Sequence, residues 1–251
     1  MWSERQAIEI FHLMFLRAFG ARVDKALFAL KGGCNLRFYH RSIRYSEDMD
    51  LDIRTMATGT LRTNVETVLE GTQLLASLRA QKILVDSVTA PKQTQTTQRW
   101  KIALRIGEQR VAVPTKIEFS RRTLDAGAVL SPVVPELIRL YRLYPVIVQH
   151  YDASAAALQK IAALALRTET QARDIFDLDL LLGAGVQPQL DAEIVKLLPQ
   201  AIENARAARR SVRQPALITT GASPGSSHRA PTIRSDGSCS CARRSWRCCR
   251  P

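Results

Sequence analysis

The chain has 251 residues, of which 46% are hydrophobic and 24% charged, a composition typical of globular proteins. This excludes collagen-like, coiled-coil and wholly disordered chains. No apolar run approaches the roughly 18 residues that a bilayer span needs, and no hydrophobic signal segment precedes Glu9. We therefore expect a cytoplasmic protein without a membrane partner.

The net charge of +13 is unevenly distributed along the chain. Residues 206–251 hold ten arginines and one acid, Asp236, and so carry +9, which leaves +4 for residues 1–205. A high net charge indicates nucleic-acid binding when it lies on the folded part of a protein. Here the predicted folded part is only mildly basic.

The last part of the chain, residues 214–251, differs in composition from the rest. Few large apolar side chains and no periodicity predict a disordered basic tail. The abrupt change near Gln214 would also fit read-through in another frame. The spacing of four cysteines there matches no usual zinc module, so a metal site is the less favoured alternative: Cys239, Cys241, Cys248 and Cys249.

The N-terminal segment predicts a helix over residues 3–19, because apolar residues recur at helical spacing after a Ser3/Gln6 capping box. Gly20 is the expected end of this helix. A short apolar stretch over residues 26–30 then leads into a glycine turn, Lys31-Gly32-Gly33. Residues 34–40 are predicted to form one or two helical turns.

Residues 49–53 alternate strictly between apolar and acidic side chains, as in a strand with one carboxylate face. Asp48, Asp50 and Asp52 should therefore point to the same side.

The middle of the chain predicts a helix over residues 61–78, capped by Thr58 or Thr60. A strand follows over residues 82–88, and strands 100–106 and 110–119 form a hairpin around a Gly-containing turn. Glu118 falls late in the second hairpin strand.

After a proline-punctuated stretch, the sequence predicts a strand over 145–149 and helices over 154–167, 170–182 and 191–210. The predicted fold class is α+β, with a small mixed sheet, flanking helices and a helical C-terminal region. We expect a core over residues 1–150, a helical region over 151–213 and the tail over 214–251.

The paired carboxylates and the glycine turn are the features that indicate chemistry. Two carboxylates on one strand face repel each other unless a cation lies between them, and oxygen ligands without His or Cys favour Mg²⁺ or Mn²⁺. A glycine turn that opens a helix offers backbone N–H groups to phosphate. Alone, an Asp-x-Asp pair is usually solvated surface. Together with the glycine turn, it points to chemistry on a nucleoside triphosphate.

These segments carry a family resemblance. The string K-G-G-x-N-L-R … R-Y-S-E-D-M-D-L-D starts at Lys31, and a second block, K-x-x-A-L-x-L-R … R-D-I-F-D-L, starts at Lys160. Together they resemble the AbiEii/AbiGii-type toxins of abortive-infection toxin–antitoxin systems, within the polymerase-β-like nucleotidyltransferases. The resemblance covers roughly residues 5–210.

The resemblance implies a metal-dependent nucleotidyltransferase and assigns residue roles. Asp48 and Asp50 fall on the metal-binding acids, Glu118 is placed like a third acid that activates the acceptor hydroxyl, and Lys160 and Asp174 fall on functional positions of the second block. The implied nucleotide-binding residues are Lys31, Gly32, Gly33, Arg44, Ser46 and Lys160. Cys34 departs from the pattern, because a small hydroxyl residue is commoner there; this removes only a side-chain contact with phosphate.

The second block has a physical interpretation of its own. Arg173, Asp174 and Asp177 can share one helix face while Phe176 and Leu180 are buried on another. The alternative is a surface salt-bridge ladder of little energetic value. Lys160 lies in an Ala/Leu-rich helix and either points into a cleft or extends to solvent.

The leading hypothesis is a toxin that transfers a nucleotide from an NTP to an RNA, with a tRNA 3′ end as the favoured acceptor and a cognate antitoxin as partner. A second hypothesis is transfer to a small molecule or a protein hydroxyl. A third is a non-catalytic module that binds RNA or a protein partner, against which the intact acids argue. His12 and His150 are interpreted as structural.

Overall fold

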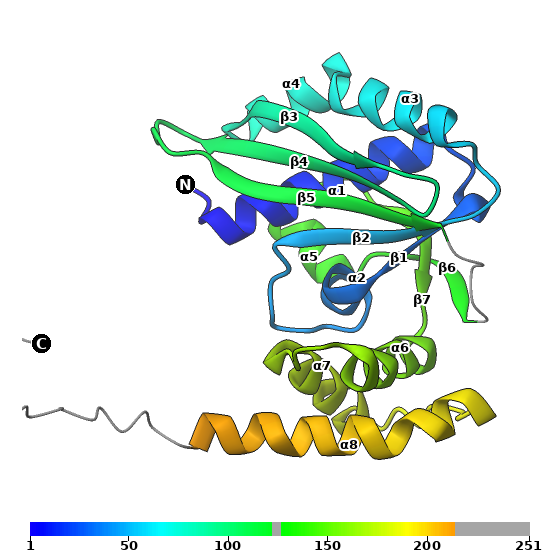
Figure 1. Cartoon of the computed structure of the whole chain (residues 1–251). Coiled ribbons are helices and arrows are strands. Elements are labelled where there is room, and N and C mark those ends of the chain that lie inside the picture. Colours follow the sequence, from blue (N-terminus) through cyan, green and yellow to red (C-terminus); the bar gives the residue numbers. More distant parts are fainter. Residues whose placement is uncertain (122–126, 214–251) are drawn as a thin grey trace, which may run out of the picture. The chain divides into compact units, whose positions relative to one another are not determined.

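A seven-stranded mixed sheet forms the centre of the protein (Figure 1). The structure is a computed structural model that describes residues 1–121 and 127–213. Its strands are β1 (Phe28–Lys31), β2 (Asp48–Ile53), β3 (Ile83–Gln93), β4 (Thr97–Ile106), β5 (Val113–Arg121), β6 (Ala128–Pro132) and β7 (Ile147–Tyr151). The tail predicted over 214–251, with its cysteines, lies outside the described residues.

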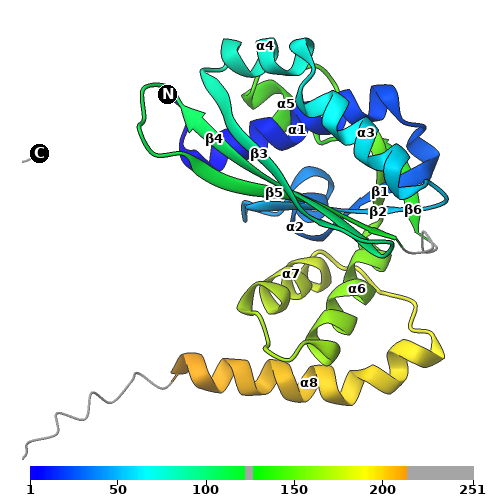
Figure 2. The same cartoon turned by 45° about the horizontal axis from the view of Figure 1, so that its top comes forward.

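The helices are α1 (Glu4–Arg22), α2 (Gly32–Tyr39), α3 (Thr58–Leu69), α4 (Thr72–Ala80), α5 (Pro135–Leu140), α6 (Ala153–Leu166), α7 (Ala172–Gly183) and α8 (Ala192–Arg213). Figure 2 shows α1, α3 and α4 on one side of the sheet and α6, α7 and α8 on the other. The expected α+β class, with a mixed sheet and flanking helices, is confirmed.

The strand order is β3-β4-β5-β2-β1-β7-β6. The pairs β1–β7 and β2–β5 are parallel, and the other neighbours are antiparallel. The acidic strand β2 therefore lies at the middle of the sheet, where β1 and β5 supply a neighbour on each side.

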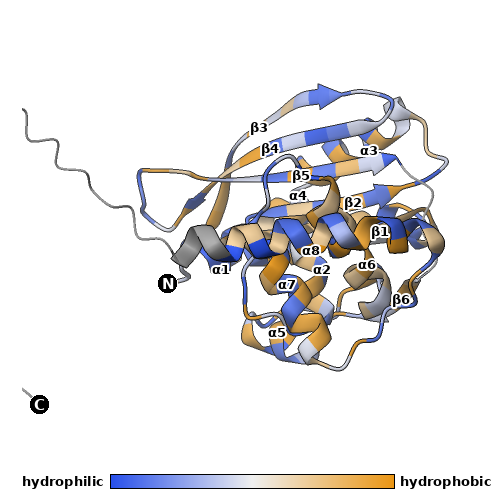
Figure 3. Ribbon diagram, turned by 60° about the horizontal axis from the view of Figure 1, so that its bottom comes forward, coloured by the Kyte–Doolittle hydropathy of each residue, from blue (hydrophilic) through white to orange (hydrophobic). Residues whose placement is uncertain are grey.

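The alternation of β4 separates an apolar face of the sheet from a polar one, and it can be followed in the residue colours of Figure 3. Trp100, Ile102 and Leu104 are buried against α1, whereas Lys101 and Arg105 are exposed on the other face. We call the polar face of strands β3 to β5 the open face.

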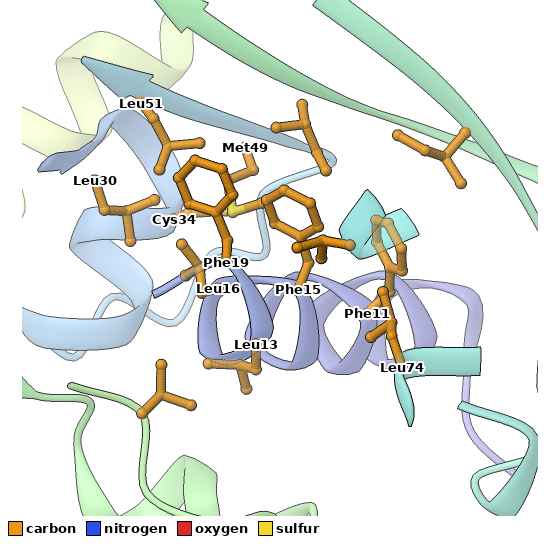
Figure 4. Packing of buried hydrophobic residues seen from close by; sticks show 14 of the residues in the cluster. Phe11, Leu13, Phe15, Leu16, Phe19, Leu30, Cys34, Met49, Leu51 and Leu74 are labelled. Atoms are coloured by element: carbon orange, nitrogen blue, oxygen red, sulfur yellow. The ribbon is translucent and has the colours of Figure 1, made fainter. Parts of the chain in front are cut away.

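Helix α1 supplies the centre of the apolar core. Phe11, Phe15 and Phe19 are fully buried and lie in a row along the helix (Figure 4). The predicted capping box is confirmed, since Ser3 and Gln6 bond reciprocally. The predicted end at Gly20 is wrong: the helix continues to Arg22. A Cβ at Gly20 would lie 3.0 Å from Val148, so close packing accounts for this glycine.

The single helix predicted over residues 61–78 is wrong, because two helices occupy this stretch. Helix α3 ends at Leu69 and α4 begins at Thr72, with Gly71 as its N-cap. The predicted cap is also wrong: Ala57 occupies the cap position of α3, and the Thr58 hydroxyl instead donates to Gln95 at 3.0 Å.

The proline-punctuated stretch contains β6 and α5, which the sequence did not predict. Strand β3 also runs farther than expected, to Gln93, with irregular register against β4 in two places. These additions extend the sheet at both edges.

Helices α6 and α8 pack through a small apolar cluster that includes Ile161, Leu164 and Ala201. Residues 1–213 group into one compact unit, and the expected boundary at residue 150 falls inside β7. Within the described ranges, no helix combines the length and hydropathy needed to cross a membrane.

Candidate functional site

Strand β2 brings Asp48 and Asp50 to one wall of a cavity of about 520 Å³. The alternation predicted for this strand is present. Asp52 is on the same face of β2 but does not line this cavity. It is 2% exposed, forms an ion pair with Lys31 and accepts a hydrogen bond of 2.9 Å from the Tyr151 hydroxyl. Of the three carboxylates of β2, two therefore line this cavity, Asp48 and Asp50.

The glycine turn lies directly against these acids. Gly32 has a φ of +67°, and a Cβ there would lie 3.1 Å from Asp50 Oδ2. A Cβ at Gly33 would come within 2.6 Å of Ser46 Oγ. Only glycines fit both positions without displacement. The N-cap of α2, Lys31, makes no side-chain cap bond, so the first N–H groups of the helix remain available to an anion.

Two side chains hold the start of β2 through hydrogen bonds to its backbone. Ser46 Oγ donates to the Asp48 carbonyl at 2.8 Å, and Cys34 Sγ donates to the same carbonyl at 3.3 Å. Burial, together with the charges of Asp50, Glu9 and Asp48, raises the pKa of the Cys34 thiol, which stays neutral. The unusual cysteine therefore supports the strand and does not line the cavity.

Strand β5 adds a cation that the sequence interpretation missed. Lys116 is the register partner of Asp48, and its Nζ lies 2.9 Å from Asp48 Oδ2. Its position two residues before Glu118 in an alternating strand was the available signal. Glu118 is the register partner of Asp50 and binds Arg99 at 2.5 Å, but it does not line the cavity.

The electrostatics of Asp50 reflect this crowding. Burial raises its pKa, the charges of Lys31 and Lys116 oppose that rise, and the nearby carboxylates of Glu118 and Asp48 add to it. A cation bound beside Asp50 would favour its ionised form.

The opposite wall of the cavity carries a buried network of charges centred on Lys160. Its Nζ lies 2.9 Å from Asp174 Oδ1 and 2.7 Å from Asp177 Oδ2. Arg44 binds Asp177 through two of its nitrogens, at 2.7 and 3.0 Å, and Arg167 binds Asp174 at 2.9 Å. Both acids are at most 1% exposed, so the alternative of a surface salt-bridge ladder is wrong.

The network also corrects the predicted helix faces of α7. Asp177 is bound by Lys160 and Arg44 and not by Arg173, which is exposed and lines the cavity. Phe176, expected to be buried, is 40% exposed. The bond from Arg44 to Asp177 ties the loop before β2 to α7, a long-range pairing that local periodicity does not reveal.

The cavity as a whole favours an anionic ligand. Six cations and four acids line it together with the two glycines and Ser46: Arg5, Arg44, Lys116, Lys160, Arg167 and Arg173 against Glu47, Asp48, Asp50 and Asp174. Lys31, predicted to bind nucleotide, lines an adjoining cavity of about 720 Å³, which shares Gly32, Asp50 and Lys160 with the first.

His12 and His150 have buried, structural surroundings. His12 Nε2 lies 2.8 Å from Thr115 Oγ1, and the Thr115 hydroxyl donates to the Glu47 carbonyl at 2.6 Å. Burial lowers the pKa of His12 to about 3 and, as the largest cause, lowers that of His150 to about 4. Both rings are neutral near pH 7.

The donor set at the cavity is compatible with a hard divalent cation. Asp48 and Asp50 offer carboxylate oxygens without competing His ligands. Among the described residues, no three His, Cys, Asp or Glu side chains gather closely enough to hold an ion by themselves. The remaining positions would fall to water and phosphate, as is usual for Mg²⁺.

A model of the family described as "Nucleotidyl transferase AbiEii toxin, Type IV TA system" matches residues 15–232. The chain belongs to this family. It is therefore a nucleotidyltransferase by family, and the type IV toxin–antitoxin description implies an antitoxin partner. No curated protein matches the chain.

Three solved structures are similar to the chain. A protein of H. pylori assigned as a nucleotidyltransferase is 16% identical with a TM-score of 0.51, covering 84% of this chain and 95% of its own. JHP933 from Helicobacter pylori is 17% identical, with a TM-score of 0.48 and coverage of 82% and 95%. An antigenic nucleotidyltransferase-like protein from Paracoccidioides brasiliensis is 16% identical, with a TM-score of 0.48 and coverage of 82% and 90%. At 16% identity, the first likeness concerns the fold alone.

Proposed function

We propose that the protein transfers a nucleotide from an NTP to the 3′ end of an RNA, with a tRNA as the favoured acceptor, in a reaction that depends on Mg²⁺ or Mn²⁺. The observation that carries the proposal is the cavity itself. It places two carboxylates of β2 opposite Lys160 and beside the glycine-opened N-terminus of α2. Carboxylates and phosphate-binding groups in one cavity suit a metal-bound triphosphate.

Each group has a distinct part in this proposal. The first N–H groups of α2, with Lys160, Arg44 and Arg167, hold the triphosphate. Asp48 and Asp50 would hold the cation, which when bound neutralises charge on the phosphates and polarises the phosphorus that is attacked. Asp174 and Asp177 fix Lys160 in place through the two ion pairs described above.

In the proposed reaction the acceptor hydroxyl attacks the α-phosphorus, the bond between that phosphorus and the bridging oxygen breaks, and pyrophosphate leaves. Glu118, which lies in register with Asp50 on the neighbouring strand, is the proposed acceptor of the hydroxyl proton. Its carboxylate is held in place by the ion pair with Arg99.

A panel of acceptors tests the proposal. The purified protein is incubated with Mg²⁺ and each α-labelled NTP, and tRNA, a mixture of small hydroxyl compounds or lysate protein is supplied as acceptor. We expect label in tRNA alone, and chelation by EDTA should abolish it. Label in protein or in a small molecule would support the second hypothesis instead. Label in none of the three, with every NTP, would favour the non-catalytic module.

A further inference from the structure

The open face of strands β3, β4 and β5 lies beside the cavity, and the established family does not account for it. Its side chains alternate with the buried ones of β4, so that Arg99, Lys101 and Arg105 point away from the core. Figure 3 looks onto this face, and no helix lies in front of β3 and β4. In the described part of the chain, this is a polar sheet face open to solvent.

The charges on this face are mainly basic, and some have no acidic partner. Arg105 forms an ion pair with Asp86, and Arg99 forms one with Glu118. Lys101 on β4 and Lys92 on β3 are exposed, and neither has an ion-pair partner among residues 1–121 and 127–213. Exposed cations without acidic partners remain available to an anionic polymer.

Rows of register partners across the sheet connect these cations with the acids of the cavity. Thr89, Lys101, Lys116 and Asp48 lie opposite one another on four successive strands. A second row runs through Lys92, Arg99, Glu118 and Asp50. Neighbouring strands lie about 4.8 Å apart, so the three steps from β2 to β3 span about 14 Å.

We propose that the open face is the docking surface for the acceptor RNA, whose last nucleotides cross β4 with their phosphates on Lys101, Arg105 and Lys92 and whose 3′ hydroxyl reaches Asp48 and Asp50. The proposal rests on the proposed function and adds where the acceptor binds. Charge complementarity selects a phosphate backbone, because the face offers cations and few apolar side chains for protein docking. Recognition here is independent of base sequence.

The test compares two charge reversals of equal size on opposite sides of the sheet. Lys101→Glu changes the open face, and Arg79→Glu changes the surface of α4, on the core side; both residues are exposed. Full-length protein is used throughout, so that residues 214–251 contribute equally to every measurement. Labelled tRNA is the probe, and its dissociation constant is measured by fluorescence anisotropy across a salt series.

We expect Lys101→Glu to raise the dissociation constant for tRNA about tenfold at low salt and to lower the salt slope by about 0.7 for each lost phosphate contact. Lys101→Gln should give a smaller loss, Arg79→Glu almost none, and all variants should keep the wild-type melting temperature. Binding of each NTP should not change. Equal tRNA affinity for Lys101→Glu and Arg79→Glu would overturn the proposal.

Transfer assays test the docking surface and the proposed function separately. If the wild type labels no RNA but Lys101→Glu still loses tRNA binding relative to Arg79→Glu, the surface stands and the proposed function fails. If the wild type labels tRNA and Lys101→Glu labels it with an unchanged KM, the reaction stands and the docking surface is wrong. Transfer to a protein acceptor that Lys101→Glu leaves unchanged would also overturn it.

Discussion

The two faces of the central sheet use opposite chemistry. On the core face, Phe15, Trp100 and Ile102 are buried in one apolar cluster, and burial of apolar surface stabilises the fold. On the face toward the cavity, Asp48, Asp50 and Lys116 are only partly buried and crowd like and unlike charges together. Stability and chemistry are thus separated by the alternation of the strands, and substitutions on the two faces should fail in different ways.

The largest effect is expected for the carboxylates of β2. Asp48→Ala and Asp50→Ala should lower the rate of nucleotide transfer about a thousandfold, or about 4 kcal/mol of activation free energy, because each removes a proposed cation ligand. The melting temperature should stay the same or rise, since one of two repelling carboxylates is gone. Single-turnover rates and thermal melts of the same preparations check both parts. A fully active Asp48→Ala variant would disprove the assignment.

A core substitution should show the opposite behaviour. Phe15→Ala removes a fully buried ring and should cost about 3–5 kcal/mol of unfolding free energy. The transfer rate per folded molecule should hardly change at a temperature where the variant is folded. Urea denaturation and a rate corrected for the folded fraction measure the two effects. A specific loss of rate at unchanged stability would mean that α1 takes part in the site.

Substitution of Lys160 should affect both ligand binding and stability, because this side chain is charged and yet only 9% exposed. Lys160→Met should weaken NTP binding and also destabilise the fold by about 3 kcal/mol, since Asp174 and Asp177 lose a buried partner. Lys160→Arg should rescue binding poorly, because a planar fork does not replace a point charge.

Lys196 on α8 offers the matched control. It is 69% exposed and binds Glu193 at 2.6 Å, so Lys196→Met should change stability by less than about 1 kcal/mol. NTP titrations and urea melts of both variants complete the comparison. If Lys160→Met behaves like Lys196→Met in both measurements, the second block has no part in nucleotide binding.

The last prediction concerns pH, where the expected change is small for each pH unit. The pKa of His12 is lowered to about 3 by burial, so on acidification the unfolded chain takes up a proton near pH 6.5 while the folded protein does not. The free energy of unfolding should therefore fall between pH 6.5 and 3, with His12 contributing up to about 1.4 kcal/mol per pH unit. His12→Gln should reduce this slope in melts across the pH range. An unchanged slope would contradict the assignment.

The sequence predicted those features that depend on local pattern. The alternation around Asp50 placed the three carboxylates of β2 on one face, and Ser3 with Gln6 predicted the start of α1. The break at Gly71 was missed because apolar spacing continues through it, and β6 and α5 because they are short and flanked by proline. The order of the predicted elements indicated the α+β class, which the sheet and its flanking helices confirm, and the family match confirms the resemblance.

The site was predicted in part for the same reason. Gly32 and Gly33 lie beside Asp50 and Ser46, and their close approaches explain both glycines. The partners of Asp177 could not be predicted, because Arg44 and Lys160 reach it from other elements. Ion pairs between distant elements depend on tertiary packing, which the periodicity of the sequence does not predict.

The central claim is that the protein transfers a nucleotide from an NTP to tRNA. The most direct test is to follow the α-phosphate and the γ-phosphate of the NTP into the products. The wild-type protein is incubated with Mg²⁺ and tRNA, once with α-labelled and once with γ-labelled NTP, and Asp50→Ala is run beside it. The account predicts α-label in tRNA, γ-label in pyrophosphate, and neither product from Asp50→Ala. Label from the γ position in tRNA, or α-label incorporated equally by Asp50→Ala, would contradict it.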